Sequence, residues 1–155
     1  MALAGFAYPG GAAGETVASP LRFFEGATES VGILKIVMQH PTSTRSDGIG
    51  SIAADGSLRL VQRVQDEGKA PHLRRWNIRQ VGPGRFTGTM SEATTPLSID
   101  QVGDRYRFRF SMRGALSVEE WLTPLAGGRS ATNELTVRKF GIVVATFRGV
   151  VRKAA

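Results

Sequence analysis

Apolar and polar residues alternate along much of this chain, and the alternation is clearest between residues 105 and 112. Tyr106, Phe108, Phe110 and Met112 take turns there with arginine and serine. A period of two is typical of a β-strand with one buried and one solvated face. We therefore expect a strand whose aromatic side chains point into a core.

Similar segments recur from residue 28 onward, separated by turns that contain glycine and proline, and they predict about ten strands. The expected strands cover residues 28–38, 44–53, 57–65, 72–81, 85–90, 95–102, 105–112, 116–125, 131–138 and 142–151. Asp55 and Gly56 form a two-residue hairpin signal, because both tolerate positive φ. The last strand is apolar on both faces near its start, so we expect it to be covered on both sides there.

This succession of strands predicts a closed antiparallel sheet. Parallel pairing needs long crossovers, and the chain has no internal helix of that length, so successive strands should pair antiparallel. An open sheet of this size would curl, and closure removes its unpaired edges. The predicted fold class is therefore all-β, a closed up-and-down barrel with room inside for side chains or one small ligand. A two-sheet sandwich is the alternative.

The beginning of the chain carries a different signal. Residues 1–18 lack the basic start of a secretory signal and are interrupted by proline and glycine, so we expect a flexible arm. Ser19, Pro20 and Gly26 fit the N-cap, the first position and the end of a short helical turn. We expect residues 19–155 to form one barrel domain, and no segment is apolar for long enough to be a membrane helix.

Composition narrows the classes of function. The chain has 155 residues, of which 41% are hydrophobic, and this excludes an intrinsically disordered protein. It has no cysteine, which rules out disulfides and thiolate metal sites and suits a cytoplasmic protein. Two distant histidines, scattered acids and the lack of nucleotide or hydrolase motifs predict neither metal nor cofactor. The net charge of +7 raises the question of an anionic partner.

Five short motifs connect the chain to a known family. They are Phe24-Glu25-Gly26, Asp55-Gly56-Ser57-Leu58, Arg75-Trp76, Gly84-Arg85-Phe86-Thr87-Gly88 and Arg138-Lys139-Phe140-Gly141. In this order and spacing they resemble an uncharacterised bacterial family of lipocalin-like, calycin-type proteins known only as a domain of unknown function. The resemblance covers residues 21–152 and implies a barrel, but it implies no established chemistry.

One strand brings together side chains that could bind a ligand. Residues 72–81 place His72, Arg74, Trp76 and Ile78 on one face. If this face points inward, an imidazole, a cation and an indole would line a cavity and could orient a small anionic or aromatic ligand. The alternative is that His72 and Arg74 lie at the rim and that Trp76 alone fills the core, because charged residues are rarely buried without a partner.

Another strand offers a candidate for acid–base chemistry. The neighbours Glu119 and Glu120 must face opposite ways, and Glu119 shares its face with Trp121. A carboxylate beside an indole in a dry cavity would have a raised pKa and could act as a general acid or base; the alternative is an ion pair with Arg138. The predicted ligand-binding residues are Arg74, Trp76, Tyr106, Phe108, Phe110, Met112 and Trp121, and the candidate catalytic residues are Glu119, His72 and Tyr106.

The arginines test the idea of a nucleic-acid partner. Proteins that bind single strands place aromatic and basic groups side by side, whereas Arg105, Arg107 and Arg109 lie on the face opposite the aromatic residues. This argues against nucleic acid and indicates a solvated outer surface, with Glu119 or Glu134 as ion-pair partners. We favour a non-enzymatic protein that binds a small apolar or amphipathic molecule inside the barrel. The alternatives are a cofactor-free enzyme acting on an enclosed hydrophobic substrate and a basic-surface interaction module. A homodimer stays open in each case.

Overall fold

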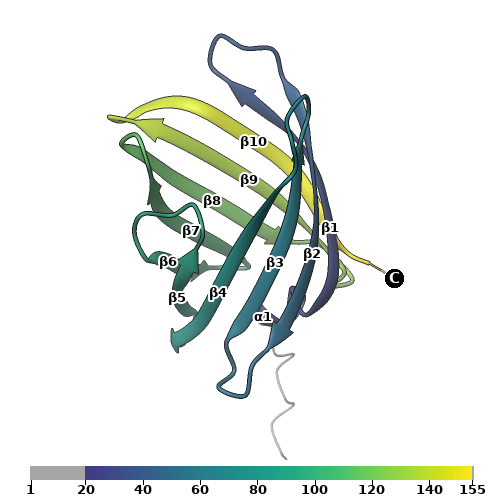
Figure 1. The fold of residues 1–155 in the computed structure, drawn as a ribbon. Helices are drawn as coiled ribbons and strands as arrows, with labels where there is room; N and C mark the ends of the chain where they lie inside the picture. The colour runs from purple at the N-terminus through teal and green to yellow at the C-terminus, as the bar shows by residue number, and fades with distance from the viewer. Residues whose placement is uncertain (1–19, 155) are drawn as a thin grey trace, which may run out of the picture.

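Ten strands follow a single helical turn in the computed structural model, which describes residues 20–154 (Figure 1). The predicted arm and the predicted N-cap, Ser19, lie outside the described residues. The elements are α1 (Pro20–Phe23), β1 (Gly26–Ile36), β2 (Thr42–Ile52), β3 (Leu58–Asp66), β4 (His72–Gly82), β5 (Arg85–Met90), β6 (Leu97–Val102), β7 (Arg105–Met112), β8 (Leu116–Pro124), β9 (Ser130–Lys139) and β10 (Ile142–Lys153).

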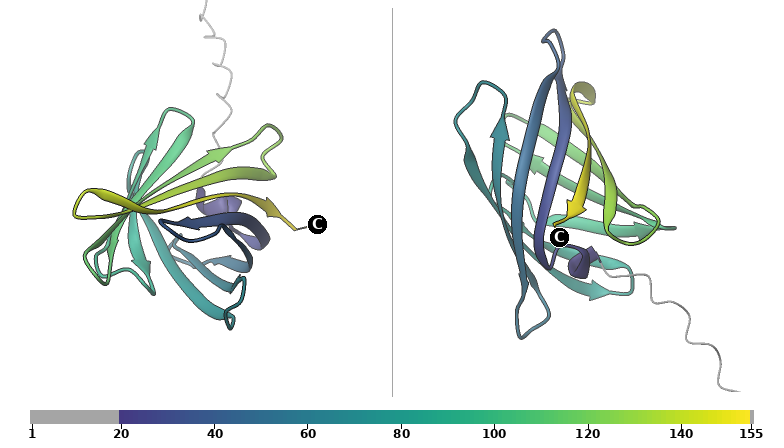
Figure 2. Two further views of the ribbon diagram at one scale, coloured as in Figure 1. Left: turned by 90° about the horizontal axis from the view of Figure 1, so that it is seen from above. Right: turned by 90° about the vertical axis from the view of Figure 1, so that its right-hand side faces the viewer.

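The strands form a closed barrel. Each strand pairs antiparallel with the next along the chain, and β10 returns to pair with β1 from Thr28↔Lys153 to Ile36↔Ala145 (Figure 2). This last pairing leaves no open edge and excludes the two-sheet sandwich. The predicted all-β, up-and-down barrel is therefore confirmed.

The two faces of each strand differ as the alternation predicts. Tyr106, Phe108 and Phe110 of β7 are buried inside the barrel, whereas the alternating residues Arg105 and Arg109 are exposed. The buried side chains form one cluster that fills the half of the barrel next to α1. It includes Leu21, Leu58, Leu60, Ile78, Phe86, Leu97, Ile99, Tyr106, Phe108, Leu122 and Val151.

The helical turn α1 closes one end of the barrel. Leu21 is buried against the core, and the Nζ atom of Lys153 donates to the carbonyl oxygens of Arg22, Phe23 and Glu25 at 3.2, 3.0 and 3.2 Å. A cation there stabilises carbonyls that have no partner within the helix. A Cβ built on Gly50 would lie 1.8 Å from the carbonyl oxygen of Phe24, so only glycine lets the chain after α1 pass this close to β2.

The opposite end of the barrel, which we call the mouth, is formed by the other set of turns: β1–β2, β3–β4, β5–β6, β7–β8 and β9–β10. The expectation that β10 is covered on both sides near its start is wrong. Ile142 is 69% exposed, and Val143 is also exposed. The last residue of β10 paired with β1 at this end is Ala145, so the residues before it have a strand neighbour only in β9.

Candidate ligand-binding site

A cavity of about 280 Å³ lies inside the barrel between the packed core and the mouth. Its wall combines apolar side chains with a slightly smaller number of polar ones. The lining residues are Ser30, Leu34, Thr44, Ser46, Gln62, Val64, Asp66, Arg74, Trp76, Met90, Glu92, Phe110, Met112, Val118, Glu120, Asn133, Leu135, Val137 and Phe147. Apolar and polar side chains are almost equally numerous in this wall, so it offers both an apolar surface and groups that can orient a small molecule.

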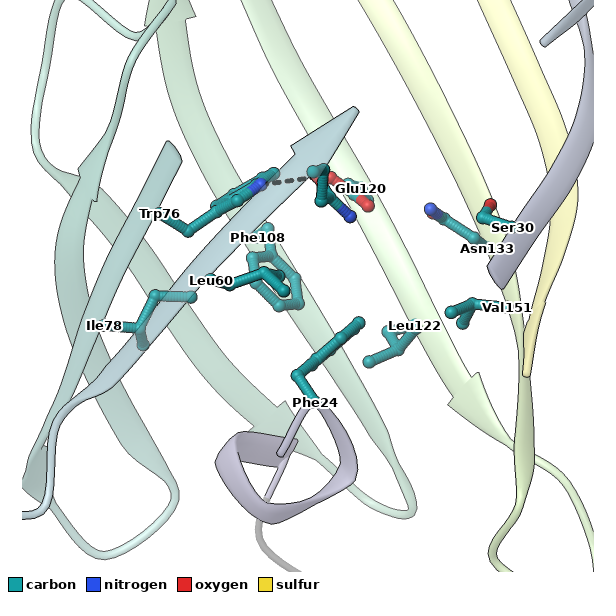
Figure 3. Close-up of a pocket in the computed structure, with 11 residues that line it drawn as sticks. Phe24, Ser30, Leu60, Trp76, Ile78, Phe108, Glu120, Leu122, Asn133 and Val151 are labelled. Carbon is teal, nitrogen blue, oxygen red and sulfur yellow. Dashed lines mark hydrogen bonds between the residues drawn. The ribbon is translucent and has the colours of Figure 1, made fainter. Parts of the chain in front are cut away.

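A second cavity, of about 50 Å³, lies next to the first on the side of α1. Phe24, Leu60 and Phe108 contribute to its apolar wall (Figure 3). The residues that line both cavities are Ser30, Gln62, Trp76, Glu120 and Asn133. We call these five residues the polar belt. They come from β1, β3, β4, β8 and β9, so the barrel brings together side chains that are far apart in the sequence.

Trp76 is held in place from two directions. Its indole Nε1 donates a hydrogen bond of 2.7 Å to Oε1 of Gln62. Its ring packs edge-to-face against Phe108 and Phe110, with both centroid distances at 6.5 Å. Such aromatic contacts favour a fixed orientation. The indole therefore forms a rigid part of the cavity wall, with its polar edge already paired.

Glu120 and Asn133 form the most unusual part of the polar belt. Removal from water raises the pKa of the Glu120 carboxyl, while a side-chain hydrogen bond from Asn133 and the positive charge of Arg74 act in the opposite direction. The Oδ1 atom of Asn133 is buried and has no hydrogen-bond partner within residues 20–154. Buried polar atoms nearly always have a partner, so this oxygen marks a place for an N–H or O–H donor.

Arg74 reaches the large cavity near the mouth, but its charge is already paired. Its Nη2 and Nε atoms lie 2.9 and 3.1 Å from Oε2 of Glu92, and Nε2 of His72 lies 3.2 Å from the other oxygen of that carboxylate. All three side chains are only partly exposed. The sequence alone did not identify Glu92, whose place on the β5–β6 turn depends on the fold. An anionic ligand would compete with Glu92 for Arg74.

The structure brings together most of the predicted ligand-binding residues. Arg74, Trp76, Phe110 and Met112 line the large cavity, and Phe108 lines the small one. His72 lies at the rim and lines neither. Tyr106 is also absent from both walls, because it is buried in the core with its ring edge-to-face on Phe86.

Glu119 and Trp121 are placed differently from the sequence expectation. Since Glu120 lines the cavities, its two neighbours on β8 face outward. The guanidinium of Arg105 lies 4.0 Å from the centre of the Trp121 ring, and Trp121 Nε1 donates to Oε1 of Glu119 at 3.1 Å. Arg109 pairs with Asp100 at 3.2 Å rather than with Glu119 or Glu134. Of these two neighbouring glutamates, therefore, Glu120 is the one that faces into the barrel.

One sequence signal could have identified Glu120. The turn at residues 113–115 joins β7 to β8, and counting outward from its Met112↔Leu116 pair places Glu120 opposite Phe108. Directly paired residues share a face of the sheet. Asn133, Gln62 and Ser30 carry no such signal. Gln62 falls on the same face as Leu58 and Leu60, but a polar residue on that face does not by itself indicate a cavity.

The described residues contain neither a cluster of metal ligands nor a membrane-spanning helix. Within residues 20–154, no three His, Asp or Glu side chains are grouped so that they could hold a metal ion. No helix in the same range combines the length and the hydropathy needed to cross a bilayer.

Comparisons with known proteins identify the fold. No protein-family model matches the chain, and no curated protein matches it significantly. Among solved structures, it is similar to the S-type phycobiliprotein lyase CPES from Guillardia theta, with a TM-score of 0.69, 9% identity, and coverage of 87% of this chain and 90% of that one. Rv2717c from M. tuberculosis gives a TM-score of 0.62 at 14% identity. That match covers 88% of this chain and 99% of the other. A protein of unknown function from the DUF3598 family of Nostoc punctiforme gives a TM-score of 0.59 at 8% identity. That match covers 86% of this chain and 49% of the other. The chain therefore shares its barrel fold with proteins of very different sequence.

Proposed function

We propose that this protein binds a small amphipathic molecule inside the barrel. The apolar body of the ligand would occupy the large cavity, and a neutral hydrogen-bonding group would reach the polar belt. A hydroxyl or a ring N–H fits best, since it can donate to Asn133 Oδ1 and lie beside the Glu120 carboxyl. The expected setting is the bacterial cytoplasm, as the sequence analysis suggests.

The observation that carries the proposal is the unpaired Oδ1 atom of Asn133, buried where the two cavities meet. A buried acceptor without a partner costs free energy on the order of 1–3 kcal/mol. Supplying its hydrogen bond from a ligand recovers this cost. A neutral ligand group is favoured because the burial that raises the pKa of the Glu120 carboxyl also disfavours a charged ligand group beside it. The barrel shared with CPES supports an enclosed ligand, although the two chains are only 9% identical.

The experiment compares three probes of nearly equal shape: naphthol, methylnaphthalene and naphthoate. Calorimetric titration should show that naphthol binds about threefold to tenfold more tightly than methylnaphthalene, the gain expected for one hydrogen bond. Naphthoate should bind most weakly, because its charge must enter beside Glu120. Equal affinities for all three, or no binding of any, would contradict the proposal.

A pair of variants then locates the binding. Asn133→Leu removes the unpaired oxygen from the polar belt and should abolish the preference for naphthol over methylnaphthalene. Asn77→Leu is the matched control, because Asn77 is exposed on the outer face of β4. This control should leave the preference unchanged. A preference that survives Asn133→Leu would place the hydroxyl elsewhere.

A further inference from the structure

Exposed apolar residues gather on one side of the mouth. Met38 is 97% exposed, Phe140 82% and Ile142 69%, and Val37 is also exposed. We call these four residues the apolar lip. Val37 and Met38 lie on the β1–β2 turn, whereas Phe140 lies on the β9–β10 turn and Ile142 begins β10. A hydrogen bond of 2.9 Å from Val37 N to Val144 O joins the β1–β2 turn to β10 (Figure 2, right).

Large apolar residues are unusual in the backbone conformation found at the tips of these two turns. Met38 and Phe140 have φ values of 65° and 49°, in the left-handed region. Phe140 and Gly141, with a φ of 80°, form the two-residue connection between Lys139 and Ile142. Such turns favour Asn-Gly, because asparagine adopts this conformation easily and is solvated well. At both tips, therefore, the chain has a large apolar side chain where backbone and solvent favour a small polar one.

The charged side chains on the segments that carry or adjoin the apolar lip are all basic. Segments 35–41, 112–116 and 138–143 contain no acidic residue, and their basic residues are Lys35, Arg113, Arg138 and Lys139. We call these four the basic collar. None of them forms an ion pair within residues 20–154. The acidic residues nearest to these segments are Asp66 and Glu67, whose carboxylates accept hydrogen bonds from Thr44 and Ser43 at the start of β2. Glu92 lies on the β5–β6 connection, farther along the rim.

We propose that this half of the mouth docks on an anionic lipid bilayer, with the tips of the apolar lip inserted at the boundary between headgroups and acyl chains. Apolar residues surrounded by lysine and arginine are the combination that binds such surfaces. A second copy of the chain fits less well, because it would bring two basic collars together. Docking does not depend on the ligand proposed above, but it would turn the mouth of the cavity toward the membrane.

The test is co-sedimentation of the whole protein with vesicles of phosphatidylcholine alone, or of phosphatidylcholine and phosphatidylglycerol in equal amounts. The wild-type protein should bind the mixed vesicles, bind the neutral ones weakly, and dissociate as salt is added. The double variant Met38→Asn with Phe140→Asn should bind the mixed vesicles at least about tenfold more weakly, because it removes two apolar side chains from the inserted surface. Asparagine suits both backbone conformations, so this variant should stay folded.

Two further variants distinguish docking through the apolar lip from non-specific adsorption to vesicles. Ile49→Thr replaces an apolar residue that is 65% exposed on the outer face of β2, away from the lip, and should leave vesicle binding unchanged. Lys139→Gln should weaken binding about fivefold, the loss expected for one basic residue near an anionic surface.

Insertion itself is read from fluorescence. Phe140→Trp places an indole at the tip, and its emission, after subtraction of the wild-type spectrum, should shift to shorter wavelength when mixed vesicles are added. Three results would overturn the proposal: no binding of the wild type to mixed vesicles, equal binding by the double asparagine variant, or no shift from the new indole. Self-association through the lip without vesicle binding would overturn it as well.

Discussion

The indole of Trp76 and the amide of Gln62 are joined by a hydrogen bond of 2.7 Å from β4 to β3, at the level where the two cavities meet. Their strands pair with Leu60 opposite Trp76 and Arg74 opposite Gln62, so the bond runs diagonally across the sheet. It satisfies the polar edge of the largest side chain in the cavity wall. The bond also fixes how far that ring projects into the space left for a ligand.

Gln62→Leu should therefore destabilise the protein by about 1–3 kcal/mol, because the Trp76 N–H loses its partner inside the barrel. In a Trp76→Phe background the same substitution should cost clearly less, since phenylalanine has no N–H to satisfy. Urea denaturation of the four proteins in this cycle gives the coupling between the two side chains. Equal costs in both backgrounds would show that the hydrogen bond contributes nothing.

The raised pKa of Glu120 predicts how stability depends on pH. Between the ordinary pKa of a glutamate and the higher value in the folded protein, the folded state binds more protons than the unfolded state. The free energy of unfolding must then fall as pH rises through this interval. Glu120→Gln removes the titration, so this variant should gain stability relative to the wild type as the pH rises above the ordinary pKa of a glutamate.

The matched control is Glu119→Gln, which changes the same residue type one position away on the outer face of β8. Its stability relative to the wild type should not show the same rise with pH. Denaturation of all three proteins across the pH range makes the comparison. A difference between Glu120→Gln and the wild type that does not change with pH would rule out the raised pKa.

Gly50 should be the most sensitive contact between the barrel and the segment that closes it. Gly50→Ala forces its Cβ against the Phe24 carbonyl, so the segment must move, at a cost of about 1–3 kcal/mol. Gly56→Asn is the control, because a Cβ at Gly56 meets open space and asparagine tolerates its φ of 84°. Thermal unfolding should separate the two variants clearly. Equal melting temperatures would show that α1 is not held at this point.

Lys153 should contribute to the same closure from the other end of the chain. Lys153→Met removes the donor to three carbonyl oxygens and should lower stability by about 1–2 kcal/mol. Arg152→Met is the neighbouring control, since Arg152 is exposed on the outer face of β10. Limited proteolysis near residues 20–25 would report release of α1 directly. Identical cleavage of both variants would contradict the role given to Lys153.

The strands could be predicted from the sequence because their alternation is strong, as in β7, where aromatic and basic residues separate completely. The side on which β8 presents its residues could not. Glu119 and Trp121 lie on one face and Glu120 on the other, and both faces also carry apolar or aromatic residues. A shift of one residue exchanges the faces of a strand, so the alternation does not decide which of the two glutamates faces inward. Trp121 is covered outside the barrel by Arg105, a contact that periodicity does not reveal.

Three members of the polar belt were beyond prediction for a related reason. Gln62, Asn133 and Ser30 are inward-facing polar residues in strands where the pattern expects apolar ones. Their common feature is position in the closed barrel, which depends on the register of five strands together. The exposed start of β10 follows the same principle, since its exposure depends on where the pairing with β1 ends at Ala145.

A crystal structure of the complex with naphthol tests the central claim most directly. The account predicts the ring system in the large cavity and the hydroxyl within hydrogen-bonding distance of Asn133 Oδ1, next to the Glu120 carboxyl. A cavity that stays empty at saturating naphthol, or a naphthol molecule bound only on the outer surface of the barrel, would contradict it.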